Sequence, residues 1–241
     1  MKVILFFFLV LSFLSVSCAE KTNANYTSMP TEDSVGIEIN KDSLLKIEIT
    51  RLRDSVLQEH DSSWVDLKIL LPTAKFDIRY ADTLNFMKIK VYECPACFTR
   101  LAVAKSLIKA SESLDSLGLG FIFYDCYRPS SAQWKLWEKM PDSRYVHPPK
   151  LGSRHSRGVA VDLSLYDLKT DQILDMGTEF DYFGKEAWWT YQGHSGIVNK
   201  NRKTLLTIMK QNNFTTVQNE WWHFDFRNQQ FSLSDFRWNC P

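Results

Sequence analysis

GSRHSRGVAVDLSL, residues 152–165, joins a polar turn to a strand-like run. In its second half, large apolar residues alternate with small or polar ones, which is the period of a strand with two unlike faces. Asp162 lies on the small face between an alanine and a serine, so its carboxylate has the room that the floor of a cleft requires. Gly158 can supply a tight turn that brings His155 back over this strand.

A second polar cluster lies in EWWHFDF, residues 220–226, the most aromatic stretch of the chain. Glu220 and His223 fall within it, and a further acid, Asp225, follows. Burying an unpaired charge there would cost several kcal/mol, so a charged or hydrogen-bonding partner must offset that cost. The aromatic composition favours a strand, and we expect Glu220 at a bend before it and His223 on it. A single Glu-x-x-His also argues against a di-iron bundle, which needs two such pairs.

His155, Asp162 and His223 together offer two imidazoles and a carboxylate, a ligand set that suits zinc with a fourth position open for water. A divalent cation would offset the desolvation of the acid, and Glu220 would remain for proton transfer. Taken singly, a histidine in an aromatic strand is commonly a hydrogen-bonded core residue, and an aspartate on a small face is often a structural acceptor. Residue spacing alone therefore leaves two alternatives, a metal site and a structural cluster.

The rest of the chain predicts helices and strands that come in blocks. Helices are expected over residues 41–59, 99–117 with Gly118 closing the helix, from Ser130 or Ser131 to about Met140, and 201–213. Strands are expected over residues 64–70, 121–129 with Arg128 near the far end, 159–165, 214–218 and 220–226. Blocks rather than strict alternation favour an α+β fold, with a central, mainly antiparallel sheet covered by helices.

The N-terminus has the layout of a secretory signal. Lys2 precedes an apolar run over residues 3–14, which is too short for a bilayer span of about 20 residues, and small residues then surround Cys18. We therefore predict that residues 1–18 are a signal peptide and that the protein is exported. Two outcomes stay open: a periplasmic protein released by cleavage after Ala19 or nearby, and a membrane-anchored lipoprotein lipidated on Cys18.

Residues 19–40 are polar and suit a flexible tether, and residues 41–241 are long enough for a single catalytic domain with a full core. Removing residues 1–18 takes away Lys2 and no acid, so the 29 basic residues become 28 against 28 acidic ones. This balance argues against nucleic acid or an anionic membrane surface as a partner. The only membrane contact that we predict is through the possible lipid anchor.

Four cysteines follow the signal segment: Cys94, Cys97, Cys126 and Cys240. In an exported protein these cysteines can be oxidised to disulfides, although a chain of this length does not need disulfides in order to fold. The first two have the Cys-x-x-Cys spacing of half a structural zinc site, but the sequence contains no second such pair. One or two disulfides, or buried thiols, are the favoured alternatives, and the pairing stays open.

Four segments, in order, resemble the zinc D-alanyl-D-alanine dipeptidases of the vancomycin-resistance type. They are YDCYRP, SRHSRGVAVDLSLY, MGTEFDYF and EWWHF, and the likeness runs from about Asp77 to Phe226. The resemblance implies a zinc D,D-peptidase (hedgehog-like) fold and one zinc ion per chain. It further implies that His155, Asp162 and His223 bind this ion.

The resemblance also implies roles for the remaining site residues. Glu220 would be the catalytic base, and Arg128 would stabilise the transition state. Asp181 would receive the free ammonium of the substrate. Ser153 would contact the substrate, with Tyr80 and Tyr92 lining the pocket.

The function implied is hydrolysis of the small dipeptide D-Ala-D-Ala to two D-alanines. Because the predicted export would keep the enzyme from the cytosolic dipeptide pool that resistance depletes, we expect salvage of cell-wall peptides as its physiological role. One alternative is a D,D-carboxypeptidase that acts on longer peptidoglycan stem peptides. Another is a wall-binding protein that keeps zinc without turnover, but such a protein would need neither Glu220 nor Arg128. His60, His147 and His194 have no acid at a telling spacing, and we assign them surface or core roles.

Overall fold

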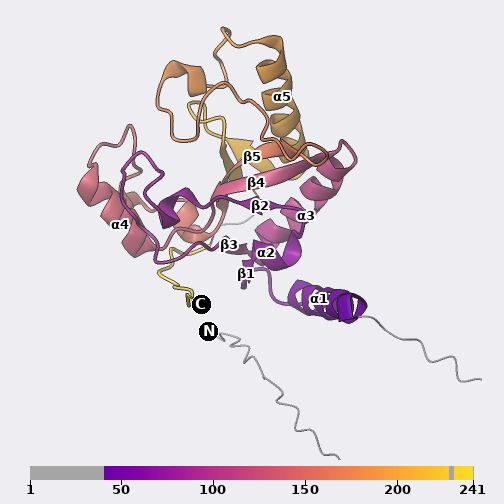
Figure 1. Cartoon of the computed structure of the whole chain (residues 1–241). Helices are drawn as coiled ribbons and strands as arrows, with labels where there is room; N and C mark the ends of the chain where they lie inside the picture. The colour runs from indigo at the N-terminus through magenta and orange to yellow at the C-terminus, as the bar shows by residue number, and fades with distance from the viewer. Residues whose placement is uncertain (1–40, 228–230, 241) are drawn as a thin grey trace, which may run out of the picture. The chain divides into compact units, whose positions relative to one another are not determined.

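In the computed structural model of the chain, one five-stranded sheet runs through the centre of the fold (Figure 1). Its strand order is β2 (Lys75–Phe76), β4 (Leu119–Asp125), β5 (Ala160–Asp167), β7 (His223–Phe226) and β6 (Phe214–Thr216). The β2 and β4 pair is parallel, whereas the β4–β5, β5–β7 and β6–β7 pairs are antiparallel. The predicted α+β fold with a mainly antiparallel sheet is therefore confirmed.

The structure describes residues 41–227 and 231–240. They belong to one compact unit, Asn40–Pro241. The predicted signal peptide, tether and lipid-anchor cysteine all fall within residues 1–40 and lie outside the described residues. Within the described part of the chain, no helix has both the length and the apolar character that crossing a bilayer requires.

The helices lie around the sheet. Their bounds are α1 (Lys41–Leu57), α2 (Leu67–Leu70), α3 (Leu101–Asp115), α4 (Ser130–Lys139) and α5 (Gly196–Gln211). Short 3-10 turns are η1 (Arg79–Ala81), η2 (Pro149–Leu151), η3 (His155–Arg157) and η4 (Lys185–Ala187). α3 packs against β4 and α5, and α5 also contacts β5 and β6. Figure 1 shows α4 on the left of the view, away from α3 and α5.

One predicted helix and one predicted strand have different bounds in the structure, each for a local reason. α5 begins five residues earlier than predicted, because the side chain of Ser195 accepts a hydrogen bond from the backbone N–H of Val198 and caps the helix. The predicted strand over residues 64–70 is wrong beyond residue 66. There the side chain of Asp66 accepts from the backbone N–H of Lys68 and starts α2 instead.

A small second sheet pairs β1 (Trp64–Asp66) with β3 (Phe98–Arg100) in antiparallel register. Arg100 places its guanidinium over the ring of Trp64, 3.7 Å from the ring centroid. The C-terminal segment packs here too, because the ring of Phe236 stacks on Trp64 at 5.4 Å. This second sheet therefore ties the end of the described chain to its middle.

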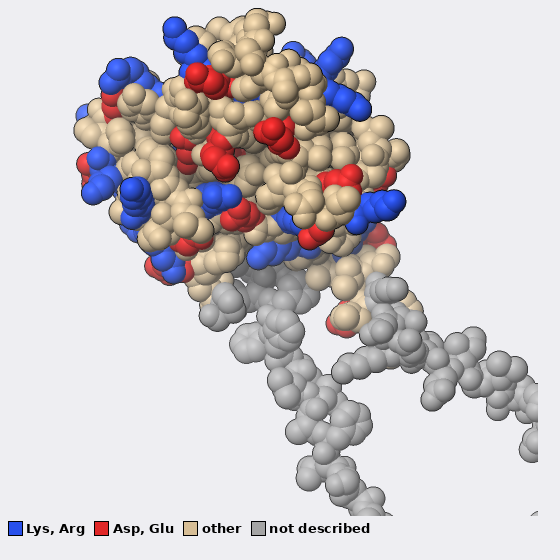
Figure 2. Space-filling view, turned by 45° about the horizontal axis from the view of Figure 1, so that its top comes forward, with Lys and Arg blue, Asp and Glu red and all other residues tan. Residues whose placement is uncertain are grey.

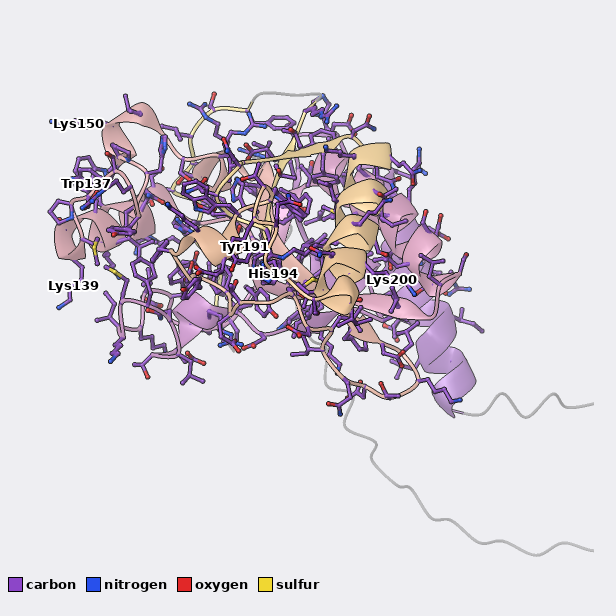
Figure 3. The ribbon with its side chains drawn as sticks, turned by 90° about the horizontal axis from the view of Figure 1, so that it is seen from above. Trp137, Lys139, Lys150, Tyr191, His194 and Lys200 are labelled. Atoms are coloured by element: carbon purple, nitrogen blue, oxygen red, sulfur yellow. A yellow bond between two sulfur atoms is a disulfide. The ribbon has the colours of Figure 1, made fainter. Side chains whose placement is uncertain are left out.

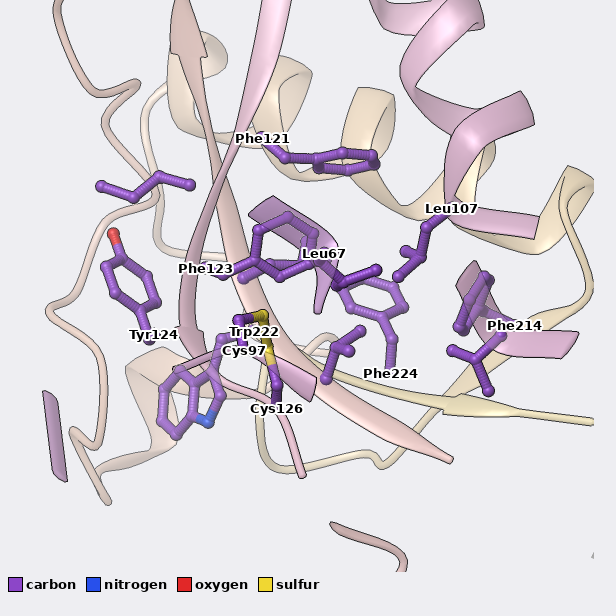
Figure 4. Close-up of a cluster of buried hydrophobic side chains, with 14 of the residues drawn as sticks. Leu67, Cys97, Leu107, Phe121, Phe123, Tyr124, Cys126, Phe214, Trp222 and Phe224 are labelled. Atoms are coloured by element: carbon purple, nitrogen blue, oxygen red, sulfur yellow. A yellow bond between two sulfur atoms is a disulfide. The ribbon is translucent and has the colours of Figure 1, made fainter. Parts of the chain in front are cut away.

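The core consists of large apolar side chains that the strands, α2 and α3 direct inward (Figure 4). Fully buried examples, labelled in the figure, are Leu67, Leu107, Phe121, Phe123, Phe214 and Phe224. Burying each such side chain stabilises the fold by about 1.5–3 kcal/mol before the loss of chain entropy is counted. The core thus fixes the positions of β4, β5 and β7, the strands that carry the polar clusters.

Both cysteine pairs are disulfides, Cys94–Cys240 and Cys97–Cys126. The first attaches the C-terminal segment, and the second lies beside the core at the end of β4 (Figure 4). Since every one of these sulfurs is bonded to another, the structural-zinc alternative for the cysteines is wrong. Of the alternatives left open by the sequence, two disulfides is the one observed.

Two of the unassigned histidines have the structural or surface roles expected for them. His194 lies in the loop before α5, near Tyr191, and its Nε2 donates to the carbonyl of Glu186 at 2.7 Å (Figure 3). His60 is exposed and hydrogen-bonds to Ser62.

On the face shown in Figure 2, several acidic side chains lie near the middle, while most lysines and arginines lie toward the rim.

Candidate metal site and cavity

The three predicted ligands come from two adjacent strands and the turn before one of them. In the antiparallel pairing of β5 with β7, Asp162 lies opposite His223. His155 is in η3, and Gly158 has a left-handed φ of 73° that turns the chain into β5. A side chain at Gly158 would also collide with the ring of Trp64, so both conformation and space require glycine there.

The donor atoms of these residues converge on one point. Asp162 Oδ1 lies 2.9 Å from His223 Nδ1 and 3.4 Å from His155 Nε2. The two imidazole nitrogens are 3.3 Å apart. All three side chains are buried, with 4% of Asp162 and 9% of His223 exposed. The structure therefore brings together the two rings and the acid that the sequence predicted as ligands.

Each imidazole has a second nitrogen that faces away from Asp162, and the hydrogen bond at this nitrogen bears on whether the cluster can bind a metal. His155 Nδ1 donates to the backbone carbonyl of Cys126 at 2.7 Å, which leaves Nε2 of a neutral ring without a proton. His223 Nε2 lies 3.0 Å from the carboxylate of Asp225, and the tautomer that donates there leaves a lone pair on Nδ1, which faces Asp162 Oδ1 at 2.9 Å. Two lone pairs and the Asp162 carboxylate then face one another, an arrangement that a metal cation satisfies.

Glu220 lies just before β7, as predicted, at the edge of this cluster. Its Oε2 is 3.9 Å from His223 Nδ1, close to the point where the donor atoms converge. Burial raises the pKa of Glu220 above its ordinary value, against the opposing effect of the neighbouring His223. A carboxyl group with a raised pKa next to a metal site can exchange a proton at moderate pH.

Arg128 follows the end of β4 and is 8% exposed. Its Nε and Nη2 donate to Asp125 Oδ2 at 3.1 and 2.6 Å, and Nη1 donates to Gln133 Oε1 at 2.8 Å. The guanidinium also lies over the ring of Tyr80, 5.0 Å from its centroid. Because a guanidinium has five N–H groups, these three bonds leave two of them for a ligand in the cavity.

Asp181 faces the same cavity from an irregular segment. The hydroxyl of Tyr80 donates to Asp181 Oδ2 at 3.0 Å, and no basic side chain of the described residues forms an ion pair with this acid. Burial, with a contribution from Asp162, raises the pKa of Asp181 well above its ordinary value. Its backbone has a left-handed φ of 60°, a conformation that costs about 1 kcal/mol and is typical of functional positions.

Of the two remaining predicted contacts, Ser153 lines the cavity and Tyr92 does not. Ser153 is buried in the cavity wall, where its hydroxyl accepts from the backbone N–H of His155 at 3.2 Å. Tyr92 is not among the residues that line the cavity. Its hydroxyl donates to Asp125 Oδ1 at 2.7 Å, so it contacts the partner of Arg128 rather than the cavity.

The cavity has a volume of about 340 Å³, and eight of the nine predicted site residues line it. His147, for which the sequence predicted a surface or core role, lines it as well, and so do Arg154 and Asp225, for which no role was predicted. Asp225 could have been found, because it lies two residues after His223 and hence on the same strand face. His147 gave no sequence signal. A larger cavity of about 650 Å³ has none of the predicted site residues in its wall.

A buried His–Asp–His ligand set with an acid and an arginine beside it defines a metal-dependent hydrolase. The family model described as D-ala-D-ala dipeptidase matches residues 60–239, and the chain belongs to this family.

Its relatives include the D-alanyl-D-alanine dipeptidase of Escherichia coli (strain K12). That protein is 34% identical over 161 residues, which are 67% of this chain and 83% of the relative. The D-alanyl-D-alanine dipeptidase of Enterococcus faecium is 30% identical over 182 residues, 67% of this chain and 90% of the relative. A crystal structure of the vancomycin-resistance D,D-pentapeptidase VanY with Zn(II) matches at a TM-score of 0.37 and 15% identity, over 55% of this chain and 74% of that chain.

Proposed function

We propose that this chain hydrolyses D-Ala-D-Ala to two D-alanines, using one zinc ion bound by His155, Asp162 and His223. Family membership and the two relatives support the reaction. The observation that carries the proposal is the convergence of two bare imidazole nitrogens and a carboxylate beside Glu220.

The donor set favours zinc among the divalent metals. Three protein ligands of nitrogen and oxygen type are the usual set of a catalytic zinc site, which keeps one position open. Donor atoms around a tetrahedral zinc lie about 3.3 Å apart, given metal–ligand distances of about 2.0–2.1 Å. The separations here are 2.9, 3.3 and 3.4 Å. When bound, zinc would supply Lewis-acid activation of water and of the peptide carbonyl.

Glu220 acts as the proton carrier of this mechanism. It takes a proton from the attacking water and later gives it to the departing amine, so one carboxyl group serves both halves of the reaction. Its raised pKa, caused mainly by burial, makes the carboxylate a stronger base for the first transfer than an exposed glutamate would be.

Arg128 stabilises the negative charge that develops on the carbonyl oxygen of the substrate. The Asp125 and Gln133 bonds fix the guanidinium before substrate arrives, so little reorganisation is needed during the reaction. One such preorganised donor typically contributes about 2.7–4 kcal/mol to lowering the barrier.

Asp181 selects substrates with a free N-terminus. Its carboxylate has the Tyr80 hydroxyl as a partner but no cation among the described residues, so an ammonium group would complete its interactions. A peptide extended or blocked at its N-terminus would bury this acid without a charge partner, which is unfavourable. This argument favours a dipeptidase over a D,D-carboxypeptidase that acts on longer peptides.

The proposal includes export of the enzyme, to the periplasm or to a membrane through a lipid on Cys18. The signal-like residues 1–18 motivate it, and the two disulfides support it because such bonds persist in oxidising compartments. An exported enzyme meets dipeptide released from the cell wall, so we propose salvage as its role. Growth on D-Ala-D-Ala that is unaffected by deleting the gene would argue against salvage.

The reaction is tested by measuring D-alanine release from three substrates under one set of conditions. They are D-Ala-D-Ala, its N-acetylated form, and a pentapeptide ending in D-Ala-D-Ala. We expect turnover of the free dipeptide and, relative to it, rates lower by about 100-fold or more for the other two, the size expected when a buried charge loses its partner. Faster release from the pentapeptide would support the D,D-carboxypeptidase instead.

A further inference from the structure

Arg154 and Asp225 lie at the cavity but have no role in the proposed reaction. We propose that they form a positioning pair, in which Asp225 fixes the tautomer of His223 and Arg154 fixes Asp225. The pair would thereby hold His223 Nδ1 bare and directed at the metal. This inference deepens the proposed function and rests on its metal site.

The geometry of the pair is specific. Asp225 Oδ1 accepts from His223 Nε2 at 3.0 Å and lies 3.3 Å from Arg154 Nε. Arg154 Nη2 donates to the backbone carbonyl of Phe226, the next residue of β7. One guanidinium therefore contacts both the carboxylate and the strand that carries it. The contact between Arg154 Nε and Asp225 Oδ1 is an ion pair without hydrogen-bond geometry, and its attraction holds the Asp225 carboxylate in place beside His223 Nε2.

The two metal-binding rings differ in how their outward nitrogens are held. His155 Nδ1 donates to a backbone carbonyl, that of Cys126, which cannot become a donor. Among the described residues, His223 Nε2 has no such backbone partner and contacts the side chain of Asp225 instead. Without that acceptor nothing would prevent the proton from moving to Nδ1, where it would occupy the lone pair that the metal needs.

A purely structural role for Asp225 is the competing explanation. Asp225 is already paired through the sheet, opposite Ala160 on β5 and Thr215 on β6. The position of β7 is therefore set on both sides without the carboxylate. Its side chain lies on the same strand face as His223, toward the cavity. These contacts indicate that Asp225 orients the imidazole of His223 rather than holding β7 in place.

The test is the zinc affinity of the metal-free full chain, measured by competition with a chromogenic chelator. We expect Asp225→Ala to weaken zinc binding by about 10–100-fold, the usual effect of losing a partner of a ligating histidine. Asp225→Asn, whose amide can still present an oxygen, should weaken it less. The matched control is Asp171→Asn, an equal loss of charge at an exposed position with a left-handed backbone that asparagine tolerates.

A second readout separates positioning from folding. Nitrogen NMR of the imidazoles should show His223 protonated at Nε2 in the parent and in the control, and a mixture of tautomers in Asp225→Ala. If that variant does not fold, Arg154→Met serves instead, with zinc binding expected to fall several-fold. Parent-like zinc affinity and an unchanged His223 tautomer in Asp225→Ala or, failing it, in Arg154→Met, would overturn the inference.

The outcome is distinguishable from failure of the proposed function, because zinc affinity is measured without substrate. A parent that binds zinc but leaves D-Ala-D-Ala intact, with Asp225→Ala binding zinc more weakly, would support the positioning pair and overturn the dipeptidase. A parent that cleaves the dipeptide, with zinc binding unchanged in Asp225→Ala, would do the reverse.

Discussion

The two walls of the cavity are built in different ways. The metal wall consists of His155, Asp162 and His223, which lie on paired strands and a glycine-closed turn. A second part of the wall, which we call the amine wall, consists of Tyr80 in η1 and Asp181 in an irregular segment, joined by a hydrogen bond between side chains. Strand pairing thus fixes most of the first wall. The second lies outside the sheet, where the backbone carbonyl of Tyr80 accepts from the N–H groups of Val91 and Tyr92 and a side-chain hydrogen bond joins Tyr80 to Asp181.

This difference predicts a division of labour. Residues on paired strands are held by many backbone bonds, so the metal wall suits chemistry that tolerates little displacement. The amine wall is held by the Tyr80–Asp181 bond and by the ring of Phe180, which packs against Tyr80 and Tyr124. Changes at the metal wall should therefore act on turnover, and changes at the amine wall on the choice of substrate.

The largest effect is expected for Glu220→Gln. Loss of the proton carrier should lower kcat by about 10²–10⁴-fold, while zinc content stays the same because this residue is not among the three predicted ligands. Steady-state kinetics and metal analysis of the same sample measure both. Glu138→Gln, an exposed position on α4, is the matched control. A Glu220→Gln enzyme with parent-like turnover would remove the residue from the mechanism.

The next largest effect is expected for Arg128→Lys. Lysine retains the positive charge that Asp125 needs but lacks the planar fork that reaches both Asp125 and the substrate. We expect kcat to fall by about 10²–10³-fold, with a smaller change in KM, because the lost contact forms mainly in the transition state. A variant that changes KM alone would instead place Arg128 in ground-state binding.

A smaller effect, and one on selectivity, is expected for Asp181→Asn. Losing a charged partner for the ammonium should lower kcat/KM for D-Ala-D-Ala by about 10–100-fold, since a hydrogen bond to a charged group contributes about 1.5–3 kcal/mol. The ratio of rates for the free and N-acetylated dipeptides should shrink at the same time. If that ratio is unchanged, the amine wall does not select the free N-terminus and the comparison between the walls fails.

The smallest effect on catalysis is expected for the double variant Cys94→Ser with Cys240→Ser. This disulfide closes a sequence separation of 146 residues, so its loss should lower the free energy of unfolding by about 2–5 kcal/mol. Neither cysteine lines the cavity, so turnover below the unfolding transition should change little. Urea unfolding and kinetics at one temperature measure the two quantities. A large loss of turnover without loss of stability would contradict this.

The same difference explains how much the sequence could predict. Alternation around Asp162 and the aromatic run around His223 are local patterns, and they gave both strands and the α+β class. The meeting of the two segments follows from strand pairing, which the sequence permitted without requiring. Asp181 depends on a left-handed backbone and on Tyr80, 101 residues away, so only the family resemblance pointed to it.

Other features had no local signal at all. The disulfide partners lie 146 and 29 residues apart, and four cysteines allow several pairings. His147 reaches the cavity because its backbone carbonyl accepts from Gln133, the residue that also holds Arg128. Such long-range side-chain contacts depend on the packed tertiary structure and leave no periodic trace in the sequence.

The most direct test of the metal wall is a crystal of the purified chain measured at the zinc absorption edge. We predict one anomalous peak per chain, bonded to His155 Nε2, Asp162 Oδ1 and His223 Nδ1, and lost together with dipeptide hydrolysis when the protein is exhaustively chelated. A peak at some other position, or full hydrolysis by chelated protein with no peak at these atoms, would contradict the account.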